Sequence, residues 1–218
     1  MWDIIAQFTP PGIDQMAEYG KPDHWSLKAQ KEGYPARSVY KLKEMDEKFG
    51  LLAGGRASFK ALDLGAAPGS WSLYILRKCP PVSLVSVDLA PLSRQQDQGL
   101  FDRDDFAFIQ GDFTLSEIRE EIVSRGPYKL LVSDAAPATT GNRFVDTLRS
   151  LDLAETALYY AETVLLAGGN LVIKVFQGGD TAGILKKIRS LFKTGKSFKP
   201  QACRAESFET YYLGLGKK

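Results

Sequence analysis

The segment ALDLGAAPGSW, residues 61–71, decides the fold of this chain. An apolar strand pattern ends at Leu64 and runs into a loop of small residues, and a helical pattern opens at Trp71. Gly65 and Gly69 permit backbone conformations and close approaches that a side chain would block. In open α/β sheets, a strand, a small-residue loop and a helix in this order form a crevice for nucleotide-type ligands. We therefore predict such a crevice after the first strand.

Short apolar runs alternate with longer helical patterns beyond this segment. The predicted strands cover residues 59–64, 84–89, 107–111, 129–133 and 171–176, with a terminal pair near 197–202 and 210–215. Nearly continuous apolar character is typical of strands that are covered on both faces. Because strands and helices alternate, we predict an α/β fold with a mostly parallel seven-stranded sheet and helices on both faces.

Helices are predicted where apolar residues recur at every third or fourth position. They cover residues 37–49, residues 148–165 and a stretch around 184–191. The second helix is expected to end at the glycine pair 168–169. We expect residues 1–57 to form a basic helical segment that packs on a core of residues 58–218. The chain should then be one compact domain.

Acidic residues follow the second and third predicted strands. Asp88 closes the second strand, where a carboxylate can accept hydrogen bonds from both hydroxyls of a ribose. Asp112 and Phe113 follow the third strand and offer an acceptor and a flat face to an adenine. Each acid could instead cap the next helix, but the ordered set favours an adenosine-containing ligand. The dinucleotide fingerprint and the Walker A motif are both missing from residues 61–71, which disfavours NAD and ATP.

The composition restricts the class of protein. Of 218 residues, 44% are hydrophobic, which is enough to fill a single core. No apolar run approaches the roughly 20 residues of a membrane-spanning helix, and the first 20 residues lack Lys and Arg, unlike a targeting peptide. We therefore expect a cytoplasmic protein with no membrane partner. Two cysteines and one histidine are too few for a four-ligand zinc site, so we expect no metal.

Charge is unevenly distributed, although the formal net charge is only +2. Residues 20–60 hold nine basic and five acidic side chains, and residues 186–218 hold nine and two. Residues 61–185, between them, hold ten basic and sixteen acidic side chains. Such basic segments are typical of nucleic-acid binding, and also of ordinary solvated surfaces.

Lys174 lies within a predicted strand of valine and isoleucine, where an unpaired charge is costly. Its ammonium could reach water along the surface. However, Asp134 ends the preceding predicted strand, at the edge where open parallel sheets bind ligands. We therefore expect Lys174 and Asp134 to face the same crevice.

Five blocks of sequence, in order between about residues 25 and 216, resemble one family of enzymes. They are residues 36–42, 63–71, 133–137, 172–178 and 204–212. On these blocks the chain resembles the FtsJ-like (RrmJ) family of S-adenosylmethionine-dependent RNA ribose 2′-O-methyltransferases, which implies a Rossmann-like methyltransferase fold.

The resemblance implies roles for individual residues. Its catalytic set of two lysines and two acids falls on Lys41, Asp134, Lys174 and Glu209. Lys174 is then the general base, Lys41 and Asp134 orient it and the target ribose, and Glu209 has a supporting role. A lysine can act as a base only where its ordinary pKa of about 10.4 is lowered. The implied residues for S-adenosylmethionine are Gly65, Gly69, Trp71, Asp88, Asp112, Phe113 and Asp134.

The resemblance also implies an RNA partner, for which we expect contacts from Lys31, Arg37, Ser38 and Arg204. Within the family, residues 29–33 and 175–178 favour the ribosomal branch, so we expect a uridine of large-subunit ribosomal RNA as the target, and we expect a monomer. Ser70 is the residue of some tRNA-modifying relatives, so transfer RNA remains the alternative. A noncatalytic RNA-binding module and a nicotinamide-dependent oxidoreductase are more distant alternatives.

Overall fold

The computed structural model describes residues 23–52, 58–179, 181–204 and 206–218. Its centre is a seven-stranded sheet in the order β3-β2-β1-β4-β5-β7-β6. The strands are β1 Lys60–Leu64, β2 Ser83–Asp88, β3 Phe106–Gln110, β4 Tyr128–Ser133, β5 Leu165–Phe176, β6 Phe192–Phe198 and β7 Glu209–Lys217. The helices are α1 His24–Lys31, α2 Val39–Phe49, α3 Ser70–Lys78, α4 Ser116–Ser124, α5 Arg143–Val164 and α6 Thr181–Leu191, with a short 3₁₀ helix, η2, at Leu100–Asp102. The predicted fold class is confirmed.

The strand order reverses at the centre of the sheet. β1 pairs in parallel with β2 on one side and with β4 on the other. The sheet is parallel from β3 to β5, and β7 runs antiparallel between β5 and β6. Ligands of open α/β sheets bind outside the carboxyl ends of the strands at such a reversal. The segment of residues 61–71 therefore lies where a ligand crevice is expected.

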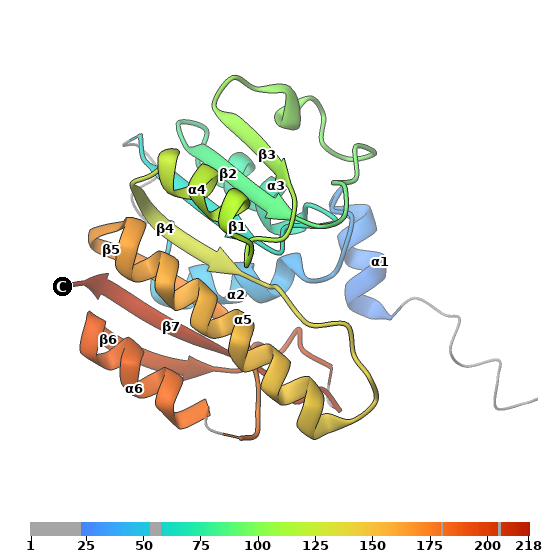
Figure 1. The fold of residues 1–218 in the computed structure, drawn as a ribbon. Coiled ribbons are helices and arrows are strands. Elements are labelled where there is room, and N and C mark those ends of the chain that lie inside the picture. Colours follow the sequence, from blue (N-terminus) through green and yellow to red (C-terminus); the bar gives the residue numbers. More distant parts are fainter. Residues whose placement is uncertain (1–22, 53–57, 180, 205) are drawn as a thin grey trace, which may run out of the picture.

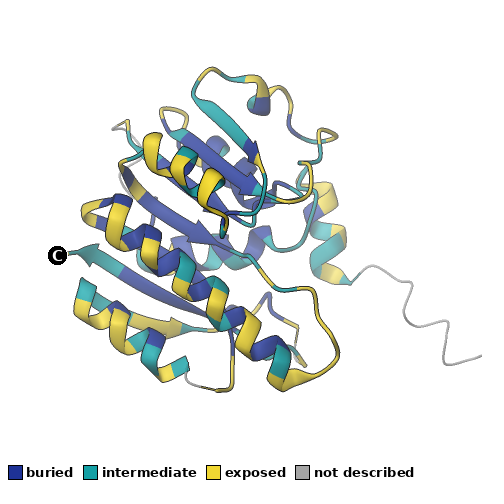
Figure 2. Ribbon diagram, in the orientation of Figure 1, coloured by how far each residue is buried: buried dark blue, intermediate teal, exposed yellow. Residues whose placement is uncertain are grey.

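Helices cover both faces of the sheet (Figure 1). α1, α2 and α3 share one apolar cluster with the sheet, and α4, α5 and α6 share the other. Successive residues of β1 serve the two clusters, since Ala61 belongs to the first and Leu62 to the second, and both are fully buried. Figure 2 shows the central strands buried between helices whose outer faces are exposed. Burial on both faces explains the nearly continuous apolar pattern of the strands.

The described part of the N-terminal segment belongs to this core. Leu42 and Met45 of α2 are fully buried and lie in the same cluster as Leu73 and Ile75 of α3. α1 and α2 therefore pack on the sheet, while residues 1–22 and 53–57 lie outside the described residues.

The end of α5 differs from the prediction. The helix was expected to continue to a glycine pair, but it ends at Val164 and β5 begins at Leu165. Gly168 and Gly169 lie inside β5, where the pairing with β4 shifts its register after Tyr128. The two glycines, which the helical spacing had assigned to the end of the helix, thus belong to a strand that pairs with β4.

The position of β6 was also predicted wrongly. It was expected near residues 197–202, whereas the strand begins directly after α6 and ends at Phe198. Phe192 is buried and anchors the start of the strand against the core. Pro200 has no N–H to donate, so it cannot extend the ladder into the expected range.

Candidate active site

A crevice of about 620 Å³ lies at the carboxyl ends of the strands, and we call it the carboxyl-edge crevice. The segments that follow β1, β2, β3 and β4 line it, together with one side of α5 and the end of β5. Six residues proposed from the sequence line this crevice: Gly65, Asp88, Asp112, Phe113, Asp134 and Lys174. The strand order thus gathers residues from five separate parts of the chain.

Gly65 is required by the close approach of two backbone segments. Its φ is +75°, and a Cβ atom at this position would lie 2.5 Å from Cα of Ala135. A larger residue would therefore push the loop after β1 away from the end of β4. Because both segments line the crevice, the width of the crevice depends on the glycine.

Asp88 and Asp112 hold the loops and still have acceptor capacity. Oδ2 of Asp88 accepts from the N–H of Ala67 at 2.9 Å, and Oδ1 accepts from the N–H of Ala90 at 2.9 Å. Oδ1 of Asp112 accepts from the N–H and the hydroxyl of Thr114 at 2.9 and 2.7 Å. A carboxylate offers about four lone-pair sites. Both residues can therefore accept further hydrogen bonds from a ligand.

Gly69 and Trp71, also proposed from the sequence, are not among the described residues that line the crevice. Gly69 precedes α3 with a φ of +109°, and a Cβ atom there would meet the ring of Phe101 at 2.9 Å. Trp71 is buried, and its indole N–H donates to the carbonyl of Ser38 at 2.8 Å. The indole therefore connects α3 to the start of α2.

Asp63 is a buried acid on β1, before the same loop, and was not predicted as a site residue. The hydroxyl of Ser72 donates to Oδ2 at 2.7 Å, whereas no described residue donates to Oδ1. Burial raises the pKa of Asp63 to about 7, and the nearby carboxylates of Asp134 and Asp88 act in the same direction. Asp63 therefore titrates near neutrality.

The four residues proposed as catalytic form two ion pairs. Nζ of Lys174 lies 3.1 Å from Oδ1 of Asp134 and also donates to the Asp134 carbonyl. Nζ of Lys41 lies 2.8 Å from Oε1 of Glu209. None of these side chains is more than 16% exposed. The structure thus brings together residues from α2, from the position directly after β4, from β5 and from β7, which are far apart in the sequence.

Strand register places the members of this cluster on one face. Lys174 of β5 lies directly opposite Tyr211 of β7, and Glu209 is two residues before Tyr211. Residues two apart on a strand, and residues directly opposite on neighbouring strands, share a face of the sheet. α2 shares a core cluster with this face and supplies Lys41.

Tyr211 is part of the cluster, although it was not predicted as a site residue. Its side chain is fully buried, and its hydroxyl donates to Oδ1 of Asp134 at 2.6 Å. The same carboxylate oxygen pairs with Lys174. The period-two alternation from Glu209 was the available signal, because it places Tyr211 on the same face.

The cluster fixes the protonation of three of its members. Burial lowers the pKa of Lys41, but Asp134 and Glu209 outweigh burial and hold this pKa above its ordinary value. Burial raises the pKa of Asp134, but Lys174 and Lys41 reverse the shift, so the pKa is lowered. Burial, with Asp134 next, raises the pKa of Tyr211 well above its ordinary value. At neutral pH, Lys41 is therefore a cation, Asp134 an anion and Tyr211 a neutral donor.

Glu44 and Arg37 hold α2 against the loop between β6 and β7. The two carboxylate oxygens of Glu44 accept from the N–H groups of Gln201 and Ala202 at 2.7 and 2.9 Å. The guanidinium of Arg37 donates to the carbonyl of Ala202 at 2.6 Å and also pairs with Asp23. Because this loop leads into β7, these contacts determine how the Lys41 and Glu209 ends of the cluster meet.

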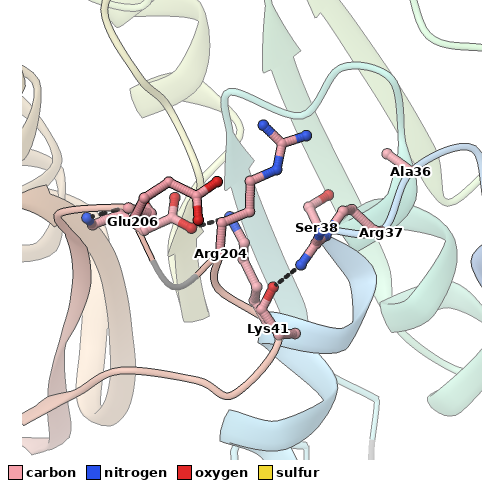
Figure 3. Close-up of a pocket in the computed structure, with 9 residues that line it drawn as sticks. Ala36, Arg37, Ser38, Lys41, Arg204 and Glu206 are labelled. Carbon is pink, nitrogen blue, oxygen red and sulfur yellow. Dashed lines mark hydrogen bonds and ion pairs between the residues drawn. The ribbon is translucent and has the colours of Figure 1, made fainter. Parts of the chain in front are cut away.

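A second pocket, of about 380 Å³, lies where α2 faces this loop, and we call it the α2–β7 pocket. Its lining is formed by Ala36, Arg37, Ser38, Lys41, Ala202, Arg204, Glu206, Ser207 and Glu209. Figure 3 shows Ser38 on one wall and Glu206 on the opposite wall, with Arg204 and Lys41 between them. Three of the four residues expected to contact RNA line this pocket, and the fourth, Lys31, is exposed at the end of α1.

Within residues 23–52, 58–179, 181–204 and 206–218, no group of three or more histidine, cysteine, aspartate or glutamate side chains is arranged to hold a metal ion. No helix in the same part of the chain has both the length and the apolar character needed to cross a membrane.

Comparison with curated proteins identifies close relatives. A protein from Treponema denticola named ribosomal RNA large subunit methyltransferase E is 50% identical over 202 residues, which cover 92% of this chain and 98% of the relative. A protein of the same name from Borreliella afzelii is 46% identical over 192 residues, covering 88% of this chain and 96% of the relative.

Solved structures share the fold. The crystal structure of a Plasmodium falciparum protein described as a ribosomal RNA methyltransferase has a TM-score of 0.67 at 23% identity and covers 84% of this chain and 98% of that chain. The MycE methyltransferase of mycinamycin biosynthesis, in complex with magnesium and S-adenosylhomocysteine, has a TM-score of 0.53 at 17% identity and covers 90% of this chain and 49% of that chain. The family model described as FtsJ-like methyltransferase matches residues 34–217. With most of its length matched in this way, the chain belongs to the FtsJ-like methyltransferase family.

Proposed function

We propose that this chain transfers a methyl group from S-adenosylmethionine to the 2′-hydroxyl of a uridine ribose in large-subunit ribosomal RNA. The observation that carries the proposal is the meeting of two lysine–carboxylate pairs, Lys174–Asp134 and Lys41–Glu209, beside the carboxyl-edge crevice. The names of relatives at 46–50% identity support ribosomal RNA over the alternative of transfer RNA.

The carboxyl-edge crevice fits S-adenosylmethionine. Asp88 has free acceptor sites for the ribose hydroxyls, and Asp112 has an oxygen for the adenine amine. Phe113 offers an apolar face, and Gly65 keeps the wall of the crevice thin. When bound, the cofactor supplies a methyl group on a sulfonium centre, which becomes a neutral thioether after transfer. Gly69 and Trp71 act in this proposal by supporting the loop.

Lys174 is proposed as the general base. The lysine of the Lys174–Asp134 ion pair must first give up its proton, and the neutral amine then accepts the proton of the 2′-hydroxyl while the oxygen forms its bond to the methyl carbon. Asp134 orients this amine through both its carboxylate and its carbonyl. Lys41 remains a cation because Asp134 and Glu209 raise its pKa, so it can orient the ribose but cannot take the proton. Tyr211 fixes the carboxylate of Asp134.

RNA is proposed to approach along α1, α2 and the loop before β7. Lys31 and Arg204 are exposed and available for phosphates or bases. Ser38 lines the α2–β7 pocket, whereas Arg37 acts by holding the loop in place. Because one chain supplies the whole cluster, we propose that it acts as a monomer. A ribosomal substrate also implies that it acts in the cytoplasm.

The test is methyl transfer from tritiated S-adenosylmethionine to three substrates: purified large-subunit ribosomal RNA, intact large subunits and transfer RNA. Digestion to nucleosides and mapping identify the labelled residue. The proposal predicts 2′-O-methyluridine in large-subunit RNA. Label confined to transfer RNA would support the alternative substrate. RNA binding without affinity for S-adenosylmethionine, measured by calorimetry, would support a noncatalytic module, and binding of NADH instead would support an oxidoreductase.

A further inference from the structure

The α2–β7 pocket is separate from the carboxyl-edge crevice but adjoins the catalytic cluster. The two pockets share no lining residue. Lys174 and Asp134 line the crevice, whereas Lys41 and Glu209 line the α2–β7 pocket. Because Lys41 is also close enough to Asp134 for their charges to shift each other's pKa, the two ion pairs form the boundary between the pockets. A ribose held at this boundary would have the carboxyl-edge crevice, which is proposed for the methyl donor, on one side and the α2–β7 pocket on the other.

The charges of the α2–β7 pocket are balanced. Arg37 is paired with Asp23, and Lys41 is paired with Glu209. The remaining charged side chains of the lining are Arg204 and Glu206, one cation and one anion. A phosphate prefers a site with several cations and no carboxylate. The pocket is therefore better suited to an uncharged group than to the RNA backbone.

The polar groups of this pocket include both donors and acceptors. Ser38 and Ser207 provide hydroxyls. The hydroxyl oxygen of Ser207 accepts from the N–H of Glu209 at 3.2 Å, so the hydroxyl hydrogen of Ser207 can be donated to a ligand. Arg204 provides donors only, and Glu206 provides acceptors only. The edge of a nucleobase presents donors and acceptors side by side. Proteins recognise a base that is turned out of an RNA stack by hydrogen bonds to this edge. A volume of about 380 Å³ is at the small end of the range for ligand pockets, about 300–1,000 Å³.

We propose that the α2–β7 pocket receives the base of the methyl-acceptor nucleotide, and that Glu206 and Arg204 select a base in which a ring N–H stands next to a carbonyl. This inference rests on the proposed function. Glu206 accepts from the ring N–H, and Arg204 donates to the neighbouring carbonyl. Uracil and guanine have this pair of groups. Cytosine and adenine present an unprotonated ring nitrogen instead, which would face the carboxylate of Glu206 with no hydrogen between them.

The test uses RNA in which the mapped acceptor position carries each of the four bases in turn. Methyl transfer is measured for the wild type, for Glu206→Gln and for a matched control, Glu120→Gln, which changes an exposed carboxylate on α4. We expect the wild type and the control to favour uracil or guanine over cytosine and adenine by at least about tenfold in kcat/KM, because a site built to hydrogen-bond a group rejects analogues that lack it. The separate uracil and guanine substrates show which of the two bases is used.

Glu206→Gln should lower this preference by at least about tenfold and leave the KM for S-adenosylmethionine unchanged, since a glutamine amide can donate to the ring nitrogen of cytosine or adenine. Equal rates with all four bases in the wild type would overturn the inference while the proposed function stands. An unchanged preference in Glu206→Gln would do the same. A wild type that methylates neither these RNAs nor intact large subunits would overturn the proposed function and this inference together.

Discussion

Replacing Tyr211 with phenylalanine removes one hydroxyl from the centre of the cluster and leaves the ring in place. This hydroxyl donates to Asp134 at 2.6 Å, and the tyrosine is fully buried. A hydrogen bond to a charged group contributes about 1.5–3 kcal/mol to stability. We therefore expect Tyr211→Phe to lower the free energy of unfolding by about this amount. For a protein of this size, each kcal/mol lowers Tm by about 2–4 °C, so the expected decrease is about 3–12 °C.

The assay is thermal and urea unfolding at pH 7, with Tyr159→Phe as the control. Tyr159 is 40% exposed, and the loss of its hydroxyl should change Tm by less than about 1 °C. The same tyrosine hydroxyl helps to hold the pKa of Asp134 down, so catalysis by Tyr211→Phe should fall while cofactor binding is retained. A Tm within 1 °C of the wild type, together with wild-type turnover, would refute the role given to Tyr211.

Three further predictions test the surroundings of the site. The pKa of Asp63, raised from 3.8 to about 7, makes the folded state bind more protons than the unfolded state between these values. The free energy of unfolding should therefore fall by up to about 4 kcal/mol as pH rises from 4 to 7.5, and urea unfolding should show that Asp63→Asn lacks this part of the pH dependence. Glu44→Gln places an amide NH₂ against one of two backbone N–H groups, so one hydrogen bond between α2 and the loop before β7 is lost. Because this contact positions Lys41 relative to Glu209, kcat should fall while the Kd for S-adenosylmethionine, measured by calorimetry, stays constant. Gly65→Ala introduces a Cβ atom 2.5 Å from Ala135, so calorimetry should show cofactor affinity reduced at least about tenfold, and unchanged affinity would contradict the close approach.

The sheet and the crevice could be predicted because their signals are local. A buried parallel strand shows a nearly continuous apolar run, and the small-residue loop after Leu64 is explained by backbone conformation and close approach. Asp88 and Asp112 end their strands in the sequence and lie at the crevice in the structure. The end of α5 and the start of β6 could not be placed in the same way, because pairing with neighbouring strands determines them.

The contacts among the residues proposed as catalytic could not be predicted from local patterns. Lys41 and Glu209 were placed in one set through resemblance to a family. Nothing in the spacing of residues 41 and 209 reveals their contact. Tyr211 was missed because its role depends on the register between β5 and β7, which brings it opposite Lys174. Arg37 lines the α2–β7 pocket, and its guanidinium is engaged by Asp23 and by the carbonyl of Ala202. Such contacts follow from tertiary packing and have no local pattern.

The most direct test of the account concerns Lys174. Lys174→Ala and a control at an exposed lysine of α6, Lys186→Ala, are compared by calorimetry with S-adenosylmethionine and by tritium incorporation into large-subunit RNA. The account predicts that both variants bind the cofactor, and that methyl transfer is lost in Lys174→Ala alone. Methyl transfer by Lys174→Ala at the rate of the wild type would contradict the assignment of the general base.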